Sequence, residues 1–441
     1  MKRISKYYAQ WRHALHYLQV LKTADELYCA GHEKVTQGLA LFELESSNIT
    51  MGQAWVENGG DGDEGVARLC VSFANSGLAI LPLRLNSSEN IRWLKKAAEW
   101  AHKLKDQPAE CTALCNLGSA YHRLSEYPRA IDSYQRAFAI ARAIGDRQGE
   151  STCLGNLGIA HDNLGEYHRA VDYYDQSLEI ARVIGDRQNE CADLGNLGRA
   201  YHNLSEYSRA IECYEQALAI ARDMGDAHGE GAWLGNLGSV YMSLNDCTNA
   251  IRNYEQALAI ARAIGDRLNE GVNLGNLGLA HWDSGEHTQS IECYEQALTI
   301  AREVRDRYGE GSWLGYLGLA YISLGEYSTA IDYLERALAI ARSLGDQSGE
   351  GMCLCNLGMA YASLGENRSG LEHYEQALAI ARKIGDRQGE GTCLANLGTA
   401  YKMMGHLSKA KELLETSLCI FEDIASSDAD QVRRNLEELR A

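Results

Sequence analysis

Residues 150–189 read ESTCLGNLGIAHDNLGEYHRAVDYYDQSLEIARVIGDRQN, and they contain the pattern that predicts the architecture of the chain. Apolar and small residues recur at helical spacing on both sides of an interruption at Gly165-Glu166. Before the interruption stand Leu154, Leu157, His161 and Leu164, and after it stand Ala170, Tyr174, Ser177 and Leu178. The stretch therefore predicts two antiparallel helices joined by a short turn.

The same pattern recurs every 40 residues from Glu110 to Ala429, in eight copies without insertion or deletion. Each copy carries a Leu-Gly pair, at Leu117-Gly118, Leu157-Gly158, Leu197-Gly198, Leu237-Gly238, Leu277-Gly278, Leu317-Gly318, Leu357-Gly358 and Leu397-Gly398. A fixed period of this length is typical of stacked helical hairpins that contact only their neighbours. The sequence predicts an all-α fold, an α-solenoid with sixteen helices from residue 110 to about 425.

The junction between copies has its own signals. Gly185 can end a helix in the left-handed conformation, and Asp186 can cap the next helix, with Glu190 in its first turn. Arg305 replaces this glycine in one copy, which predicts a strained or altered turn. An arginine four residues before the junction Asp predicts an exposed ion pair between them, at positions 142, 182, 222, 262, 302, 342 and 382.

Leu154, Leu157, Gly158, Ala170 and Tyr174 stand at the spacing of the tetratricopeptide consensus, and the chain resembles that family over about 320 residues. The resemblance implies a right-handed superhelix of antiparallel helix pairs, in which the small residues permit close approach and the tyrosine fills the gap. The 40-residue unit is longer than the common one. In this it is similar to Pins-type spindle-orientation adaptors and kinesin light chains, families that hold extended peptides.

The flanks predict further helices. Residues 1–65 form an N-terminal helical extension, distantly similar to the segment that precedes the repeats in bacterial STAND ATPases, although no P-loop is present. Residues 66–109 read as a degenerate repeat that caps the eight units of 110–429, and residues 430–441 as a C-terminal capping helix. Asn58 to Asp63 reads as a turn; residue 69 is Leu, which excludes an EF-hand loop.

Charge and composition exclude several classes of ligand. The formal net charge of -18 disfavours nucleic acid, and no stretch approaches the 18 apolar residues of a membrane span. We therefore expect a cytoplasmic protein that binds neither nucleic acid nor membranes. Thirteen scattered cysteines predict free thiols, and no spacing suggests a metal site or cofactor.

The family resemblance implies a concave surface lined by the first helix of each copy, with one asparagine from most copies. These are Asn116, Asn156, Asn196, Asn236, Asn276, Asn356 and Asn396, with Tyr316 in the remaining copy. An amide can pair with both groups of a peptide bond, so these residues are candidates to bind a ligand's backbone. The alternative is that they bond to each other or to nearby backbone.

Other positions of this surface divide it into two parts. The polar part comprises His122, Arg123, Arg199 and His202, together with Ser119, Asp162, Asn163 and Asn203. The apolar part comprises Leu279, Trp282, Leu319, Ile322 and Met359. Trp282 is either an interface anchor or inter-repeat packing, whereas Trp233 and Trp313 are expected to pack between repeats.

The sequence thus predicts a scaffold that binds an extended peptide or partner segment in its concave groove. The alternative is a sensor or regulatory subunit of a signalling or defence assembly whose partner carries the enzymatic activity. No Ser-His-Asp, Cys-His or paired-carboxylate arrangement converges, so we expect no catalytic residue and no enzyme activity. Partner identity and oligomeric state are not encoded in any recognisable pattern.

Overall fold

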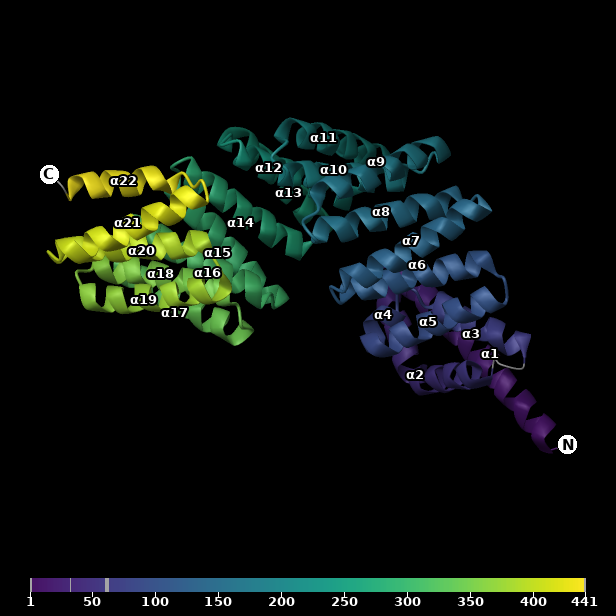
Figure 1. Cartoon of the computed structure of the whole chain (residues 1–441). Coiled ribbons are helices and arrows are strands. Elements are labelled where there is room, and N and C mark those ends of the chain that lie inside the picture. The colour runs from purple at the N-terminus through teal and green to yellow at the C-terminus, as the bar shows by residue number, and fades with distance from the viewer. Residues whose placement is uncertain (1, 32, 60–62, 440–441) are drawn as a thin grey trace. The chain divides into compact units, whose positions relative to one another are not determined.

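The computed structural model describes residues 2–31, 33–59 and 63–439, and every regular element within these ranges is a helix (Figure 1). The chain divides into two compact units, Met1–Met224 and Gly225–Ala441, which are described separately.

The first unit holds five N-terminal helices and three helix pairs. The N-terminal helices are α1 (Lys2–Cys29), α2 (Glu33–Gly59), α3 (Glu64–Ser76), α4 (Leu81–Arg84) and α5 (Ser87–Lys103). The pairs are α6 (Gln107–Arg123) with α7 (Tyr127–Ile144), α8 (Arg147–Asn163) with α9 (Tyr167–Ile184), and α10 (Arg187–Asn203) with α11 (Tyr207–Met224).

The second unit holds five helix pairs and a final helix. The pairs are α12 (Ala227–Ser243) with α13 (Cys247–Ile264), α14 (Arg267–Asp283) with α15 (His287–Val304), α16 (Arg307–Ser323) with α17 (Tyr327–Leu344), α18 (Gln347–Ser363) with α19 (Asn367–Ile384), and α20 (Arg387–Met403) with α21 (Leu407–Asp423). The last helix is α22 (Asp428–Glu438). Helices α6 to α21 are the sixteen that the period predicts; we call the even-numbered members of this set first helices and the odd-numbered members second helices.

Close approach within each pair depends on the glycine of the Leu-Gly motif. A Cβ atom built on Gly158 of α8 would lie 2.5 Å from Cε1 of Tyr174, whose side chain on α9 is fully buried. In the pair α16–α17, Leu334 takes the place of the tyrosine and would meet a Cβ on Gly318 at 2.5 Å. The predicted combination of a small residue and a gap-filling side chain is therefore confirmed.

The junctions between pairs also follow the prediction. Gly185 ends α9 with φ 73° and ψ 24°, and the Asp186 carboxylate accepts a hydrogen bond from the Asn189 amide at 3.1 Å. Arg305 ends α15 in the same left-handed region, with φ 59° and ψ 33°. The turn therefore keeps the same conformation. Its backbone is strained at Arg305, because residues with a side chain are disfavoured in the left-handed region.

The prediction that each of these arginines pairs with the junction aspartate is wrong for Arg182, Arg262, Arg302, Arg342 and Arg382, which pair with glutamates. Arg182 Nε donates instead to Glu190 Oε1 at 3.1 Å, eight residues on, because the Asp186 carboxylate is already occupied as a helix cap. Arg187 approaches the same carboxylate at 2.9 Å. Equivalent pairs are Arg262–Glu270, Arg302–Glu310, Arg342–Glu350 and Arg382–Glu390.

The flanking helices pack onto the repeats. Leu94 and Ala98 of α5 are buried, as a degenerate repeat requires, while Val432 and Leu436 of α22 pack in the apolar cluster of Leu414 on α21. The division into four segments stays a prediction.

The predicted turn at residues 58–63 falls partly outside the described residues, since residues 60–62 are not described. Asp63 caps α3 and accepts a hydrogen bond from the Tyr7 hydroxyl.

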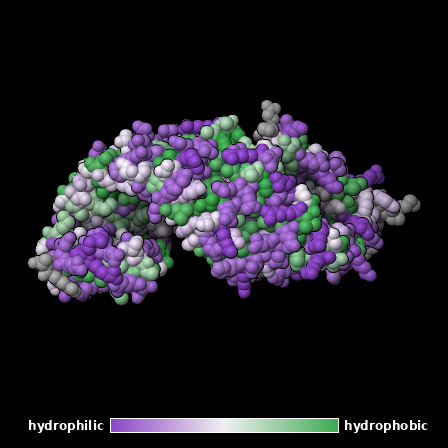
Figure 2. All heavy atoms as spheres, turned by 90° about the horizontal axis from the view of Figure 1, so that it is seen from above, coloured by the Kyte–Doolittle hydropathy of each residue, from purple (hydrophilic) through white to green (hydrophobic). Residues whose placement is uncertain are grey.

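The cysteines and the surface show neither disulfides nor a membrane-spanning helix among the described residues. All thirteen cysteines are free thiols, as predicted. Among the described residues no helix is both long and apolar enough to cross a membrane. Figure 2 shows a face that is largely hydrophilic, with scattered hydrophobic side chains between the charged ones.

Candidate binding surface

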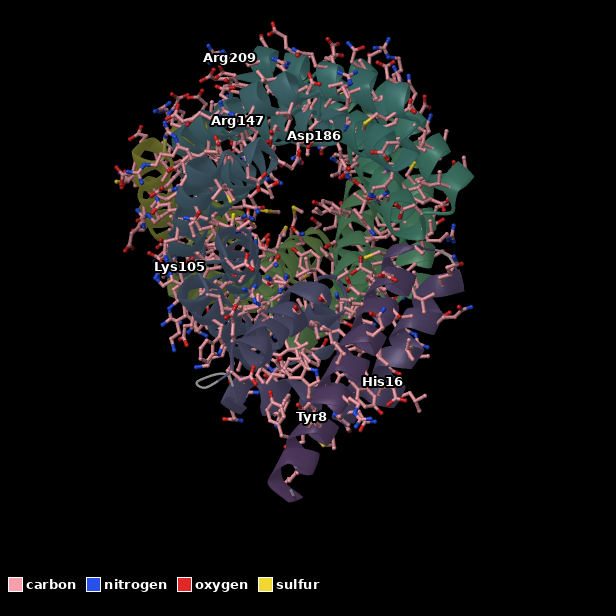
Figure 3. The ribbon with its side chains drawn as sticks, turned by 90° about the vertical axis from the view of Figure 1, so that its right-hand side faces the viewer. Tyr8, His16, Lys105, Arg147, Asp186 and Arg209 are labelled. Carbon is pink, nitrogen blue, oxygen red and sulfur yellow. The ribbon has the colours of Figure 1, made fainter. Side chains whose placement is uncertain are left out.

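The asparagines predicted to bind a ligand lie on the first helices of both units. Asn116, Asn156 and Asn196 belong to α6, α8 and α10 in the first unit, and Asn236, Asn276, Asn356 and Asn396 to α12, α14, α18 and α20 in the second. All seven are half-buried. Figure 3 places the labelled Arg209, near the start of second helix α11, at the outer side of the ribbon and Asp186, which caps first helix α10, toward its inner side.

The asparagine amides differ in what they contact. Within the described part of the chain no asparagine of this set bonds to another, and the side chains of Asn236, Asn276 and Asn356 have no hydrogen-bond partner. Asn196 accepts a bond from Arg199 at 3.4 Å, and the Asn116 Nδ2 atom is buried without a partner among the described residues. The second unit therefore holds three half-buried asparagine amides without a hydrogen-bond partner among the described residues.

Two further asparagines of the set contact thiols of the preceding repeat. Asn156 Nδ2 lies 3.6 Å from Cys115 Sγ, and Asn396 Nδ2 lies 3.3 Å from Cys355 Sγ. Each of these thiols also accepts a hydrogen bond from the thiol 38 residues further on, Cys115 from Cys153 and Cys355 from Cys393. This hydrogen bond lowers the pKa of Cys115 and of Cys355. These two asparagines thus serve contacts between neighbouring first helices.

The polar residues predicted to line the surface are largely engaged with one another. Arg199 Nη2 lies 2.7 Å from Oδ2 of the buried Asp162 carboxylate, across the α8–α10 contact. His122 receives the Asn163 amide at 3.1 Å, while Arg123 is exposed. Burial lowers the pKa of His122 and of the half-buried His202, so both rings are neutral at pH 7.

The predicted apolar residues lie in the second unit and are half-buried. Leu279, Ile322 and Met359 pack against the buried core, and Leu319 borders a cavity. The Trp282 ring stands 4.5 Å from the His287 ring, centroid to centroid, within its own helix pair. The two alternatives for Trp282 both stay open.

Trp313 packs between repeats, as predicted. Its ring on α16 covers Gly275 of α14, so that a Cβ on Gly275 would lie 2.0 Å from Cη2 of Trp313. It also stacks at 6.2 Å from the Tyr294 ring.

Asp193 is a buried carboxyl group that the sequence did not single out. It lies on α10 where it covers Gly155 of α8, and its Oδ2 atom has no hydrogen-bond partner among the described residues. Burial raises the pKa of Asp193 to about 7. In the second unit the equivalent residue is Asn273, which covers Gly235 and donates to the Asn269 carbonyl at 2.9 Å. An amide therefore fits this position.

A cavity of about 170 Å³ opens between α16, α17 and α18. Its lining includes Tyr308, Tyr316, Leu344, Met352 and Asn356. A cavity of about 150 Å³ accommodates a benzene-sized group. The space is therefore large enough for one planar side chain of a ligand.

The cavity exists because two small residues face each other there. In each repeat, the residue equivalent to Gly275 faces the residue 38 positions later, on the next first helix. Trp313 is that residue for Gly275. At Gly315 the covering residue is Cys353, and a Cβ on Gly315 would meet nothing within 4 Å. Sequence reasoning missed this cavity, although the 38-residue offset would have revealed it.

Among the described residues, no three His, Cys, Asp or Glu side chains stand close enough to hold a metal ion.

Comparisons with known proteins agree with the repeat. The family model for the tetratricopeptide repeat matches residues 91–143, 110–182, 151–223, 229–303, 271–343 and 350–423, which cover more than half of the chain. No curated protein sequence matches the chain.

Several solved structures share the fold at low sequence identity. A STAND signal-transduction ATPase with a tetratricopeptide sensor, from Pyrococcus horikoshii, is 16% identical with a TM-score of 0.55, covering 95% of this chain and 68% of that one. The quorum sensor NprR from B. thuringiensis is 16% identical with a TM-score of 0.55, covering 77% and 95%. Aspartyl phosphate phosphatase F from Bacillus subtilis is 12% identical with a TM-score of 0.56, covering 80% and 93%. With the family model matching most of its length, the chain belongs to the tetratricopeptide repeat family.

Proposed function

We propose that the chain binds an extended peptide segment of a partner protein along the first helices of its second unit. The tetratricopeptide fold supports a protein-interaction or regulatory sensor role. The observation that carries the finer proposal is the set of half-buried, unpartnered amides of Asn236, Asn276 and Asn356. Asparagine is a mediocre helix former, so its recurrence in mid-helix needs a compensating interaction, which a peptide backbone would supply.

The spacing of the asparagines suits an extended ligand. Neighbouring first helices lie about 10 Å apart, and an extended chain advances about 3.3 Å per residue. Successive amides would therefore meet about every third residue of the peptide. Tyr316 interrupts the line between Asn276 and Asn356, so the peptide backbone would be held on both sides of that residue.

Peptides selected from a random library displayed on phage against the whole chain provide the test. Fluorescence anisotropy then compares the affinity of one selected peptide for the wild type and for Asn236→Ala, Asn276→Ala and their combination. Each lost hydrogen-bonding site should weaken binding by about 1 kcal/mol, or about fivefold. Asn396→Ala is the matched control, because that amide already contacts Cys355 and should matter less.

Circular dichroism separates the two explanations of the asparagines. Alanine favours helix more than asparagine, so the variants should melt at or above the wild-type temperature if the amides serve a ligand. If the double variant unfolds, the amides are structural. If it stays folded and binds the peptide as the wild type does, the ligand uses another surface.

A regulatory sensor is the second candidate. Two of the similar structures are a quorum sensor and an ATPase with a tetratricopeptide sensor, and the alignment with the latter covers 95% of this chain. In that role the chain would change the activity of a partner enzyme on binding its peptide. Co-purification from the native host, with and without added peptide, would test this: a partner whose amount does not respond to peptide would contradict it.

A further inference from the structure

The cavity between α16, α17 and α18 contains a carboxylate oxygen that no described residue of the protein bonds. Asp346 lines it and caps α18, with Oδ1 accepting from the Gly349 amide at 2.9 Å. Its other oxygen, Oδ2, has no hydrogen-bond partner among the described residues. The neighbouring Glu310 and Glu350 are both paired with arginines, so Asp346 is the carboxylate here without a cation.

Other repeats show what this oxygen accepts. Gln148 Nε2 donates to Oδ2 of Asp186 at 2.5 Å, and Gln388 Nε2 donates to Oδ2 of Asp428 at 2.7 Å. His228 Nδ1 approaches Oδ2 of Asp266 at 3.2 Å. At Asp186 and Asp266, a nitrogen donor 38 residues earlier on the preceding first helix thus occupies the second oxygen of a junction aspartate. Asp428 is instead the first residue of α22, and its donor lies 40 residues earlier.

The corresponding residue before Asp346 is Tyr308, which stands 38 positions earlier, as Gln148 does before Asp186. Its side chain is 66% exposed at the rim of the cavity, and it has no hydrogen bond to Asp346. The internal nitrogen donor is therefore missing at a junction where the covered residue is glycine and the covering residue is only a cysteine. A cavity, an unoccupied carboxylate oxygen and two tyrosine rings, of Tyr308 and Tyr316, come together.

We propose that this cavity binds an arginine side chain of the peptide, with the guanidinium donating to Asp346 Oδ2 and its aliphatic stem against Leu344 and Met352. This inference rests on the proposed function. Asn356 also lines the cavity, so a backbone held by its amide would bring a side chain to the opening. Arginine suits the site better than lysine, because a planar guanidinium both stacks on aromatic rings and donates to a carboxylate. The net charge of -18 favours a cationic ligand as well.

The test uses the peptide acetyl-Ala-Ala-Arg-Ala-Ala-amide and the same peptide with citrulline, which keeps the shape of arginine without its charge. Methionine methyl groups of the whole chain are labelled with ¹³C, and the Met352 methyl reports on the cavity, with Met242 of α12 as the internal control. The arginine peptide should shift the Met352 signal saturably and leave Met242 in place. The citrulline peptide should bind at least tenfold more weakly.

Two variants remove different parts of the site. Asp346→Asn keeps a good helix cap and removes the charge, so it should abolish the preference for arginine over citrulline. Cys353→Trp repeats the arrangement in which Trp313 covers Gly275, and should fill the cavity and eliminate the shift. Equal binding of the two peptides, no shift of Met352, or arginine binding unchanged in Asp346→Asn would each overturn the inference.

The outcomes separate this inference from the proposed function. If the phage-selected peptide loses affinity in Asn236→Ala and Asn276→Ala while Met352 does not respond to arginine, the peptide surface stands and the arginine site fails. If Met352 responds to arginine while those variants bind the selected peptide normally, the cavity stands and the asparagine surface fails. Should Cys353→Trp not fold, Asp346→Asn alone decides.

Discussion

Two glycines on α16 allow the close-packing argument to be tested within one helix. Gly318 faces Leu334, whose side chain is fully buried and would lie 2.5 Å from an added Cβ. Gly315, one turn earlier, would present its Cβ to open space. Replacing either glycine with alanine gains about 1 kcal/mol of helix propensity, so this contribution cancels in the comparison.

The difference between the two variants then measures the close approach of α16 and α17. Overpacking a dense core costs about 1–3 kcal/mol, because the surrounding side chains must leave their preferred positions. Gly315→Ala should therefore stabilise the protein by about 1 kcal/mol. Gly318→Ala should be less stable than Gly315→Ala by about 1–3 kcal/mol, equivalent to about 5- to 140-fold in the opening equilibrium.

Hydrogen exchange followed by mass spectrometry suits this test, because helical repeats open locally and a single unfolding temperature averages over them. Peptides from α16 and α17 should exchange faster in Gly318→Ala than in Gly315→Ala, whereas peptides from α6 and α7 should exchange alike in both. Equal protection of α16 in the two variants would refute the argument that this glycine permits the helix contact.

Three further changes have defined expected outcomes. The pKa of Asp193 lies near 7 when folded and near 4 when unfolded, so the folded state binds the extra proton and stability falls as the pH rises between these values. Asp193→Asn should therefore melt above the wild type at pH 8 and close to it at pH 4.5; a constant difference would contradict the assignment. Arg305→Gly should stabilise α15 by up to about 1 kcal/mol in thermal melts, while Arg305→Ala should not, because alanine is also disfavoured at φ 59°. The hydrogen bond from Arg382 holds the pKa of Glu390 below its usual range. The ionised Glu390 therefore contributes fully to folding stability above its unfolded pKa of about 4.3, and this contribution is lost as the pH falls through the lower pKa of the folded state. Glu390→Gln should cost about 1 kcal/mol in urea unfolding at pH 7 and much less near pH 3.

Most of the fold could be predicted because its signals are local. The left-handed turn at Gly185, the cap at Asp186 and the contact between Gly158 and Tyr174 each depend on residues within one 40-residue unit. The period then repeats these local solutions. The altered turn suggested for Arg305 was not found, because the surrounding pair of helices holds the arginine in the glycine conformation.

The site was less predictable because its contacts cross from one repeat to the next. Glu190, rather than Asp186, pairs with Arg182, since the spacing alone does not show that the aspartate is already used as a cap. Likewise, no single unit reveals that Arg199 is paired with the buried Asp162 of the preceding repeat. The line of asparagines was visible in the sequence, but which of its amides lack a partner depends on the neighbouring helix.

The 38-residue offset has a consequence for how such a protein can change. A gap between first helices is made half by one unit and half by the next, as with Gly315 and Cys353. Removing residues 310–349 would set Gly275 opposite Cys353 and eliminate Trp313, while every cap and turn kept its sequence. Deletion, duplication or reordering of whole units can therefore create or erase a side-chain pocket in a single genetic event, without substituting one amino acid.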